Sequence, residues 1–175
     1  IIPFWKSAFP KLLSYNRFIE IMPRCLQALS SFFHQVKGED TGICIIDSTK
    51  LVVCHNLRIK RHRVFKGLAG RGKSSTGWFY GFKVHIVINN LGEIINLKIT
   101  SGSVHDVAVL ESLTQELKGI LLGDKGYLSK AKTEALAARG LRLLTPSRKN
   151  MKNKPIQTEE EKQFQISTLD SLHKF

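Results

Sequence analysis

The sequence predicts a mixed α/β fold in which helices cover a sheet, and three observations carry this prediction. Two short apolar runs, residues 43–47 (ICIID) and 119–124 (GILLGD), each end in an aspartate, as buried strands near a functional site often do. A hairpin pattern lies between these two runs, and helical patterns follow it. A chain of 175 residues with 42% hydrophobic residues is long and apolar enough to form one domain with its own core.

The first half of the chain predicts a helical segment followed by strands. Residues 11–36 place apolar side chains at close to helical spacing, which predicts a helix or a helix pair, bent at Pro23. Residues 38–42 (GEDTG) are typical of a turn, and a buried central strand follows at residues 43–47. Further along, residues 82–89 and 93–100 flank a short Asn-Leu-Gly turn and predict a β-hairpin.

The second half predicts alternating helices and strands. A helix is expected from Val104, with Ser103 as its N-cap and Gly119 beyond its end. A second helix is expected between Ser129 and Gly140, which have the residue types preferred before and after helices. A last strand then ends at Pro146, and a further helix is a candidate after it.

The charge is strongly positive and unevenly distributed. The chain has 27 Lys and Arg against 14 Asp and Glu, a formal net charge of +13, which favours a polyanionic partner, above all nucleic acid. Residues 50–81 contain no acidic residue, and we interpret them as a basic insertion after the first strand. Phosphate contacts are expected there and near the second aspartate, with a solvated surface as the alternative; the candidates are Arg58, Lys60, Arg61, Arg63, Lys66, Arg71, Lys73, Lys125, Lys149 and Lys152. The aromatic run 78–80 (WFY) adds possible stacking partners for bases or sugars.

Cysteine usage and hydropathy bear on the location of the protein. The three cysteines, Cys25, Cys44 and Cys54, form no C-x-x-C pair, which fits a reducing cytoplasm. The apolar runs are shorter than the ~20 residues that a membrane span requires, so we expect no membrane association. The first residue is not Met, and we expect a fragment of a longer chain.

Two competing motifs are weaker than they look. Residues 67–74 match G-x-x-x-x-G-K-[ST] in letter, but the charged segment before them and the poor helix-forming segment after them do not fit a nucleotide-binding loop, so we expect no nucleotide cofactor. We interpret these residues as a flexible basic loop that contacts DNA phosphates. The histidines and cysteines do not have the paired spacing of zinc ligands. His85 and His105 are expected to be structural.

The two aspartates are the strongest candidates for chemistry. If the strands before Asp47 and Asp124 are neighbours, their carboxylates converge at one edge of the sheet. Carboxylates are suitable ligands for Mg²⁺ or Mn²⁺, and such ions can activate and stabilise the oxygens exchanged in phosphoryl transfer. The alternative for either residue alone is an ordinary strand or turn cap.

Two segments carry a family resemblance. Residues 45–89, from IIDSTK to HIVIN, and residues 121–129 (LLGDKGYLS) resemble the DDE-type transposases of bacterial insertion sequences. The resemblance implies a ribonuclease H-like catalytic core over residues 41–155, after an N-terminal helical segment 1–40 and before an atypical tail 156–175. It implies that Asp47 and Asp124 are catalytic metal ligands, that Mg²⁺ or Mn²⁺ is the cofactor, and that DNA, as transposon ends and target, is the partner; a homodimer is a candidate assembly.

The resemblance also calls for a third acid, a glutamate on a helix after the last strand. Glu161, in the run 159–161, is the candidate, but the segment TEEE also fits a helix capping box. Asp106 resembles a recurring family position, and we interpret it as structural or as a support to the ligands. Three functions remain open: a transposase that cuts and joins DNA, a truncated and inactive chain that only binds DNA, and a ribonuclease H-like nuclease.

Overall fold

The computed structural model describes residues 11–145, and the chain divides into two compact units, Ile1–Lys37 and Gly38–Phe175. The first unit contains helix α2 (Tyr15–Val36), which begins after Ser14, whose side chain accepts a hydrogen bond from the Arg17 backbone N–H. Pro23 lies inside this helix, so the residues predicted as a helix or a helix pair form one helix. No helix in the described range is long and apolar enough to cross a membrane.

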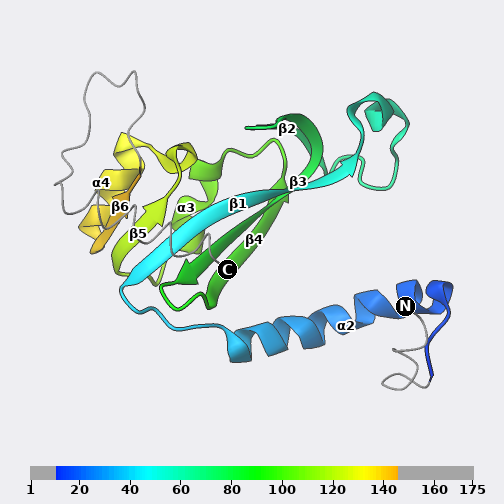
Figure 1. Ribbon diagram of the computed structural model, residues 1–175, viewed down its shortest axis with the longest axis horizontal. Coiled ribbons are helices and arrows are strands. Elements are labelled where there is room, and N and C mark those ends of the chain that lie inside the picture. Colours follow the sequence, from blue (N-terminus) through cyan, green and yellow to red (C-terminus); the bar gives the residue numbers. More distant parts are fainter. Residues whose placement is uncertain (1–10, 146–175) are drawn as a thin grey trace. The chain divides into compact units, whose positions relative to one another are not determined.

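The second unit is built on a six-stranded sheet (Figure 1). Its strands are β1 (Ile43–Cys54), β2 (Gly70–Ser74), β3 (Gly77–Asn89), β4 (Ile94–Ser101), β5 (Gly119–Gly123) and β6 (Leu141–Leu144). They lie in the order β2-β3-β1-β5-β6, and β4 also pairs with β3. β3 is antiparallel to β1, β2 and β4, whereas β5 is parallel to β1 and to β6. The predicted mixed α/β sheet is therefore confirmed.

Two helices provide the main cover on one face of the sheet. Helices α3 (Asp106–Leu113) and α4 (Lys130–Ala138) contribute Leu110, Leu113 and Leu136 to a core that also contains side chains of β1, β3, β5 and β6. A smaller cluster of Ile45, Leu122 and Leu144 forms from alternate residues of β1, β5 and β6. Because successive side chains of a strand point to opposite faces, this second cluster belongs to the other face of the sheet.

Nearly half of the segment predicted as a basic insertion is part of the sheet. β1 continues to Cys54, a short 3-10 helix η1 (Asn56–Arg61) follows, and β2 and β3 then form a hairpin. The expectation of a flexible loop at residues 67–74 is wrong for β2. Its glycines serve close packing instead: a Cβ at Gly72 would lie 2.2 Å from the Gly102 carbonyl oxygen and 2.7 Å from the Phe79 ring. The G-x-x-x-x-G-K-S match thus ends in a strand that is followed by a turn and another strand.

The helix boundaries differ from the prediction at two places. α3 begins at Asp106, not near Val104, because residues 101–104 form a turn in which the Ser103 hydroxyl bonds the Ser101 hydroxyl at 3.0 Å and makes no cap. It ends at Leu113, and the Thr114 hydroxyl bonds the Leu110 carbonyl at 2.8 Å. α4 lies within the predicted range, but the Ser129 side chain makes no cap hydrogen bond.

Candidate active site

Asp47 lies within β1 and not at its end, which corrects the prediction. The parallel pairing of β1 with β5 stops at Ile46 and Gly123, whereas the antiparallel pairing with β3 continues as far as Cys54. The partner strand β3 thus holds β1 extended after β5 has turned away. Asp47 is the first residue of β1 beyond its parallel pairing.

Asp124 directly follows β5, as predicted. It is the N-cap of η2 (Lys125–Tyr127), a single 3-10 turn, and its backbone is extended. Since Ile46 and Gly123 are register partners, Asp47 and Asp124 are the next residues of two adjacent parallel strands. Asp47 comes two residues after Ile45, and Asp124 comes two residues after Leu122; Ile45 and Leu122 belong to the smaller apolar cluster. Because side chains two residues apart on a strand share a face, both aspartates continue the face of that cluster. The prediction that these strands are neighbours is confirmed.

A cavity of about 430 Å³ opens where β1 and β5 diverge. Asp47 and Asp124 are exposed to solvent and both line it. Each carboxylate is oriented by the next backbone N–H: the Ser48 N–H donates to Asp47 Oδ1 at 2.7 Å, and the Lys125 N–H donates to Asp124 Oδ1 at 2.6 Å. A carboxylate has a second oxygen with further acceptor capacity. The donor set of two oriented, water-accessible carboxylates therefore fits a hard divalent cation.

Within residues 11–145, no group of three or more His, Cys, Asp and Glu is placed to hold a metal ion. In the described part of the chain, Asp47 and Asp124 are therefore not joined by a third such residue. The candidate third acid, Glu161, lies outside the described residues, as do Lys149 and Lys152.

The lining of the cavity also includes cations and hydroxyls. Lys50 and Lys73 line it together with the turn residues 74–76 (SST). The Lys50 ammonium donates to the Thr76 hydroxyl and, at 3.5 Å, to the Ser74 hydroxyl. The cavity therefore combines carboxylates with donors suited to phosphate oxygens. Lys50 was not among the predicted contacts, and its place three residues after Asp47 on an extended strand gives no signal for it, because such residues point to opposite faces.

Lys83 and Asp106 form a partly buried ion pair beside the cavity. The Lys83 ammonium donates to Asp106 Oδ1 at 2.9 Å and to the Val104 carbonyl at 3.0 Å, and both side chains line the cavity. The Ser48 hydroxyl also donates to Asp106 Oδ1, at 3.3 Å. Sequence reasoning missed Lys83, because one lysine in an apolar strand gives no signal of its own.

A buried histidine and tyrosine continue this polar cluster behind the site. His85 has no exposed surface; its Nε2 is 2.9 Å from the Thr100 hydroxyl and its Nδ1 is 3.5 Å from the Tyr127 hydroxyl. Burial raises the pKa of Tyr127 far above its ordinary value, and the negative charge of Asp106 adds to the effect. Burial also lowers the pKa of His85 below 6.5, although Asp106, with its carboxylate 3.9 Å away, opposes this.

The lowered pKa of His85 predicts acid sensitivity. Because the unfolded state binds the His85 proton more tightly than the folded state, stability is full above the unfolded pKa of 6.5 and falls as the pH drops through it. We expect the temperature at the midpoint of thermal unfolding to decrease as the pH is lowered from about 7 to about 5. The decrease should be smaller in His85→Gln. Circular dichroism melts of both proteins across this range test it, and equal slopes would contradict it.

The predicted phosphate contacts are distributed over three places. Arg58, Lys60 and Arg61 belong to η1, and Arg63 and Lys66 follow it in the turn before β2; Figure 1 shows this segment at the far end of β1 from β5. Arg71 and Lys73 lie on β2, and Lys125 directly follows Asp124. On the β2–β3 hairpin, the Arg71 guanidinium lies 5.0 Å and the Lys73 ammonium 5.8 Å from the ring centre of Trp78, which is 55% exposed. The structure thus combines cations and an aromatic face beside the cavity.

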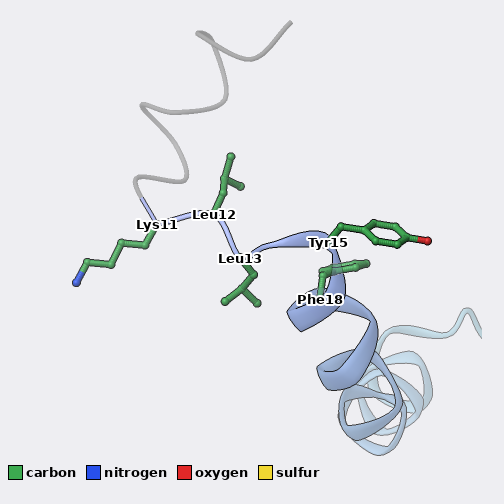
Figure 2. Close-up of a pocket in the computed structure, with 5 residues that line it drawn as sticks. All are labelled: Lys11, Leu12, Leu13, Tyr15 and Phe18. Carbon is green, nitrogen blue, oxygen red and sulfur yellow. The ribbon is translucent and has the colours of Figure 1, made fainter.

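A second hollow, of about 480 Å³, lies at the start of α2 in the first unit (Figure 2). Its five lining residues are Lys11, Leu12, Leu13, Tyr15 and Phe18. They include no carboxylate, so this hollow offers no acidic metal ligand. The cavity at Asp47 and Asp124 is the better candidate site.

Comparison with known families decides what the second unit is. Residues 37–169 match the family described as the transposase DDE domain, which is most of the chain. The chain belongs to the DDE transposase family. Divalent metals are generally used by the DDE domains of this family. A comparison with curated protein sequences gave no significant match.

A comparison with solved structures found similar transposases. The cryo-EM structure of a piggyBac transposase synaptic complex with hairpin DNA matches with a TM-score of 0.50 and 13% identity, over 89% of this chain and 31% of that one. The crystal structure of the Mos1 strand transfer complex matches with a TM-score of 0.35 and 10% identity, over 97% of this chain and 61% of that one. The chain thus spans about a third of the piggyBac chain and three fifths of the Mos1 chain. The fold is the ribonuclease H-like fold that the resemblance implied.

Proposed function

We propose that this chain is the catalytic domain of a bacterial insertion-sequence transposase, which cuts DNA at the transposon ends and joins the ends to a target. The observation that carries this proposal is the placement of Asp47 and Asp124 one residue beyond the parallel pairing of two adjacent strands, in a cavity that Lys50 and Lys73 also line. Two carboxylates and a phosphate-binding wall are the parts that metal-dependent phosphoryl transfer requires.

In this proposal Asp47 and Asp124 hold Mg²⁺ or Mn²⁺. A bound ion would supply Lewis acidity and lower the pKa of a coordinated oxygen nucleophile. The chain's own residues perform the positioning: the Ser48 and Lys125 N–H groups fix the two carboxylates, and Lys50 and Lys73 attract the DNA backbone to the cavity. A third acid, for which Glu161 is the candidate, would complete the ligand set.

DNA is the proposed partner. Three features of the chain support it: the net charge of +13, the lysines that line the cavity, and the exposed Trp78, whose ring lies near Arg71 and Lys73. The piggyBac complex, to which the fold is similar, contains DNA. The β2–β3 hairpin contributes Lys73 to the cavity that the two carboxylates line. It is therefore the segment that we expect to hold the strand being cut.

Removing charge from this hairpin should change the salt dependence of DNA binding. In the double variant Arg71→Gln with Lys73→Gln, the plot of log affinity against log salt should become shallower. We expect the magnitude of its negative slope to decrease by about 2, since each lost phosphate contact removes about one released counterion. Fluorescence anisotropy with a labelled duplex at several salt concentrations measures this slope.

The matched control is Lys130→Gln, which removes one positive charge from α4, where Lys130 is exposed and pairs with Glu134 at 4.0 Å. The control should leave the slope unchanged. A hairpin variant with the wild-type slope would show that Arg71 and Lys73 face solvent in the complex and do not contact phosphate.

The reaction itself is tested with the full chain and a linear DNA that carries the element's own ends. The proposal expects cleavage that requires Mg²⁺ or Mn²⁺, followed by products in which the cut ends are joined to a second DNA. Cleavage without joined products identifies a nuclease. Binding without cleavage identifies a chain that only binds DNA, and either result overturns the proposal.

A further inference from the structure

Asp106 contacts both chain segments that carry the two site carboxylates. Its Oδ1 accepts a hydrogen bond from the hydroxyl of Ser48, the residue after Asp47, at 3.3 Å. Its Oδ2 packs against Gly126, two residues after Asp124, so closely that a Cβ on Gly126 would lie 2.9 Å from it. One side chain from α3 therefore lies against β1 on one side and against the η2 turn on the other.

Lys83 holds this carboxylate in place. The Lys83 ammonium bonds Asp106 Oδ1 at 2.9 Å and the Val104 carbonyl at 3.0 Å, and the two side chains are only 13% and 22% exposed. Hydrogen bonds to a charged group in such a partly buried place are stronger and more geometrically specific than bonds in water. Asp106 is thus not a freely rotating surface carboxylate.

Asp106 itself is not placed as a ligand. Asp106 lines the same cavity as Asp47 and Asp124, but its Oδ1 already accepts hydrogen bonds from Ser48 and Lys83. No three-residue ligand group that includes it occurs in the described range. Its charge is matched by Lys83, which leaves it a mechanical role.

We propose that Asp106 is a positioning residue that ties the Asp47 segment to the Asp124 segment and so sets the spacing of the two carboxylates for a divalent cation. This inference rests on the proposed function, since it assumes that the two carboxylates bind the metal. Groups that orient metal ligands typically change metal affinity by about 10–100-fold when removed, because a misplaced ligand loses its bond to the ion.

Direct Mn²⁺ binding tests the proposal without catalysis. The full chain, without DNA, is titrated with Mn²⁺, and free Mn²⁺ is followed by electron paramagnetic resonance. We expect Asp106→Ala to weaken binding about tenfold or more. Asp106→Asn should stay near the wild type, because its amide oxygen can still accept from Ser48 and Lys83.

The matched control is Glu111→Gln on the same helix. It removes a carboxylate that pairs with Lys132 at 2.7 Å and is not part of the cavity lining. Glu111→Gln should leave Mn²⁺ affinity unchanged. A loss equal to that of Asp106→Ala would show that any carboxylate of α3 has the same effect, which contradicts the proposal.

A double-mutant cycle with Gly126→Ala separates positioning from general destabilisation. The new methyl group should push against Asp106 Oδ2 and weaken Mn²⁺ binding severalfold in the wild-type background, but not in the Asp106→Ala background, where the oxygen is absent. Should Asp106→Ala fail to fold, Ser48→Ala and Gly126→Ala carry the test alone, and wild-type binding by both overturns the proposal.

The outcomes distinguish this inference from the proposed function. If the wild type binds no Mn²⁺, or if its Mn²⁺ binding persists in Asp47→Asn and Asp124→Asn, the metal site itself is refuted. If those two variants lose binding while Asp106→Ala binds as tightly as the wild type, the metal site stands and the positioning role of Asp106 is overturned.

Discussion

Asp47→Asn and Asp124→Asn should each reduce metal-dependent DNA cleavage by about a thousandfold or more. The stabilisation that a metal ion supplies is several kcal/mol, and each ~1.4 kcal/mol corresponds to a factor of ten in rate. Each change keeps the shape of the side chain and its acceptor for the next backbone N–H, but it removes the negative charge that binds the ion. DNA affinity, measured by anisotropy without divalent ions, should remain nearly unchanged, because the phosphate contacts come from lysines and arginines.

The control for these variants is Asp40→Asn, at the opposite end of the same pair of strands. Asp40 accepts backbone hydrogen bonds from Gly42 and Lys118, each at 2.9 Å, so it connects the segments that lead into β1 and β5. Burial acts to raise its pKa, but these bonds and the Cys44 thiol outweigh it and lower the pKa. Asp40→Asn should keep cleavage per folded molecule. Wild-type cleavage by either site variant would refute the assignment of that residue.

Gly119→Ala should strongly destabilise the sheet. Gly119 has φ +86°, and a Cβ there would lie 2.2 Å from the Gly42 carbonyl oxygen, which already accepts a hydrogen bond from the Ile120 N–H. A left-handed backbone conformation costs an alanine about 1–2 kcal/mol, and overpacking typically adds about 1–3 kcal/mol. We expect the free energy of unfolding to fall by about 2–5 kcal/mol, which is a large part of the stability of a small domain.

Gly140→Ala is the control that isolates the backbone conformation from the clash. Gly140 has φ +83° and also precedes a strand, but a Cβ there would meet nothing within 4 Å. Its expected loss is only about 1–2 kcal/mol. Urea unfolding followed by circular dichroism measures both variants. Equal losses would show that the contact with Gly42 relaxes without cost.

Much of the fold was accessible from local patterns. Apolar runs identified β5 and the start of β1, the Asn-Leu-Gly turn identified the β3–β4 hairpin, and Gly140 marked the end of α4. The errors arose where tertiary contacts override local signals. β1 extends past Asp47 because β3 continues to pair with it, and residues 70–74 form a strand because Gly72 fits closely against Gly102 and Phe79.

The sequence by itself determined the family resemblance and the candidates for the chemistry: two aspartates after apolar strands, a large positive charge, and segments that resemble DDE transposases. These properties depend on residue type and spacing, which a sequence contains in full. Only the tertiary structure decided that Asp47 and Asp124 follow register partners of adjacent parallel strands, that Lys50 and Lys73 line the same cavity, and that Asp106 reaches both carboxylate-bearing segments. These contacts join residues far apart in the chain, and their geometry depends on strand order and register, which are set when the whole sheet assembles.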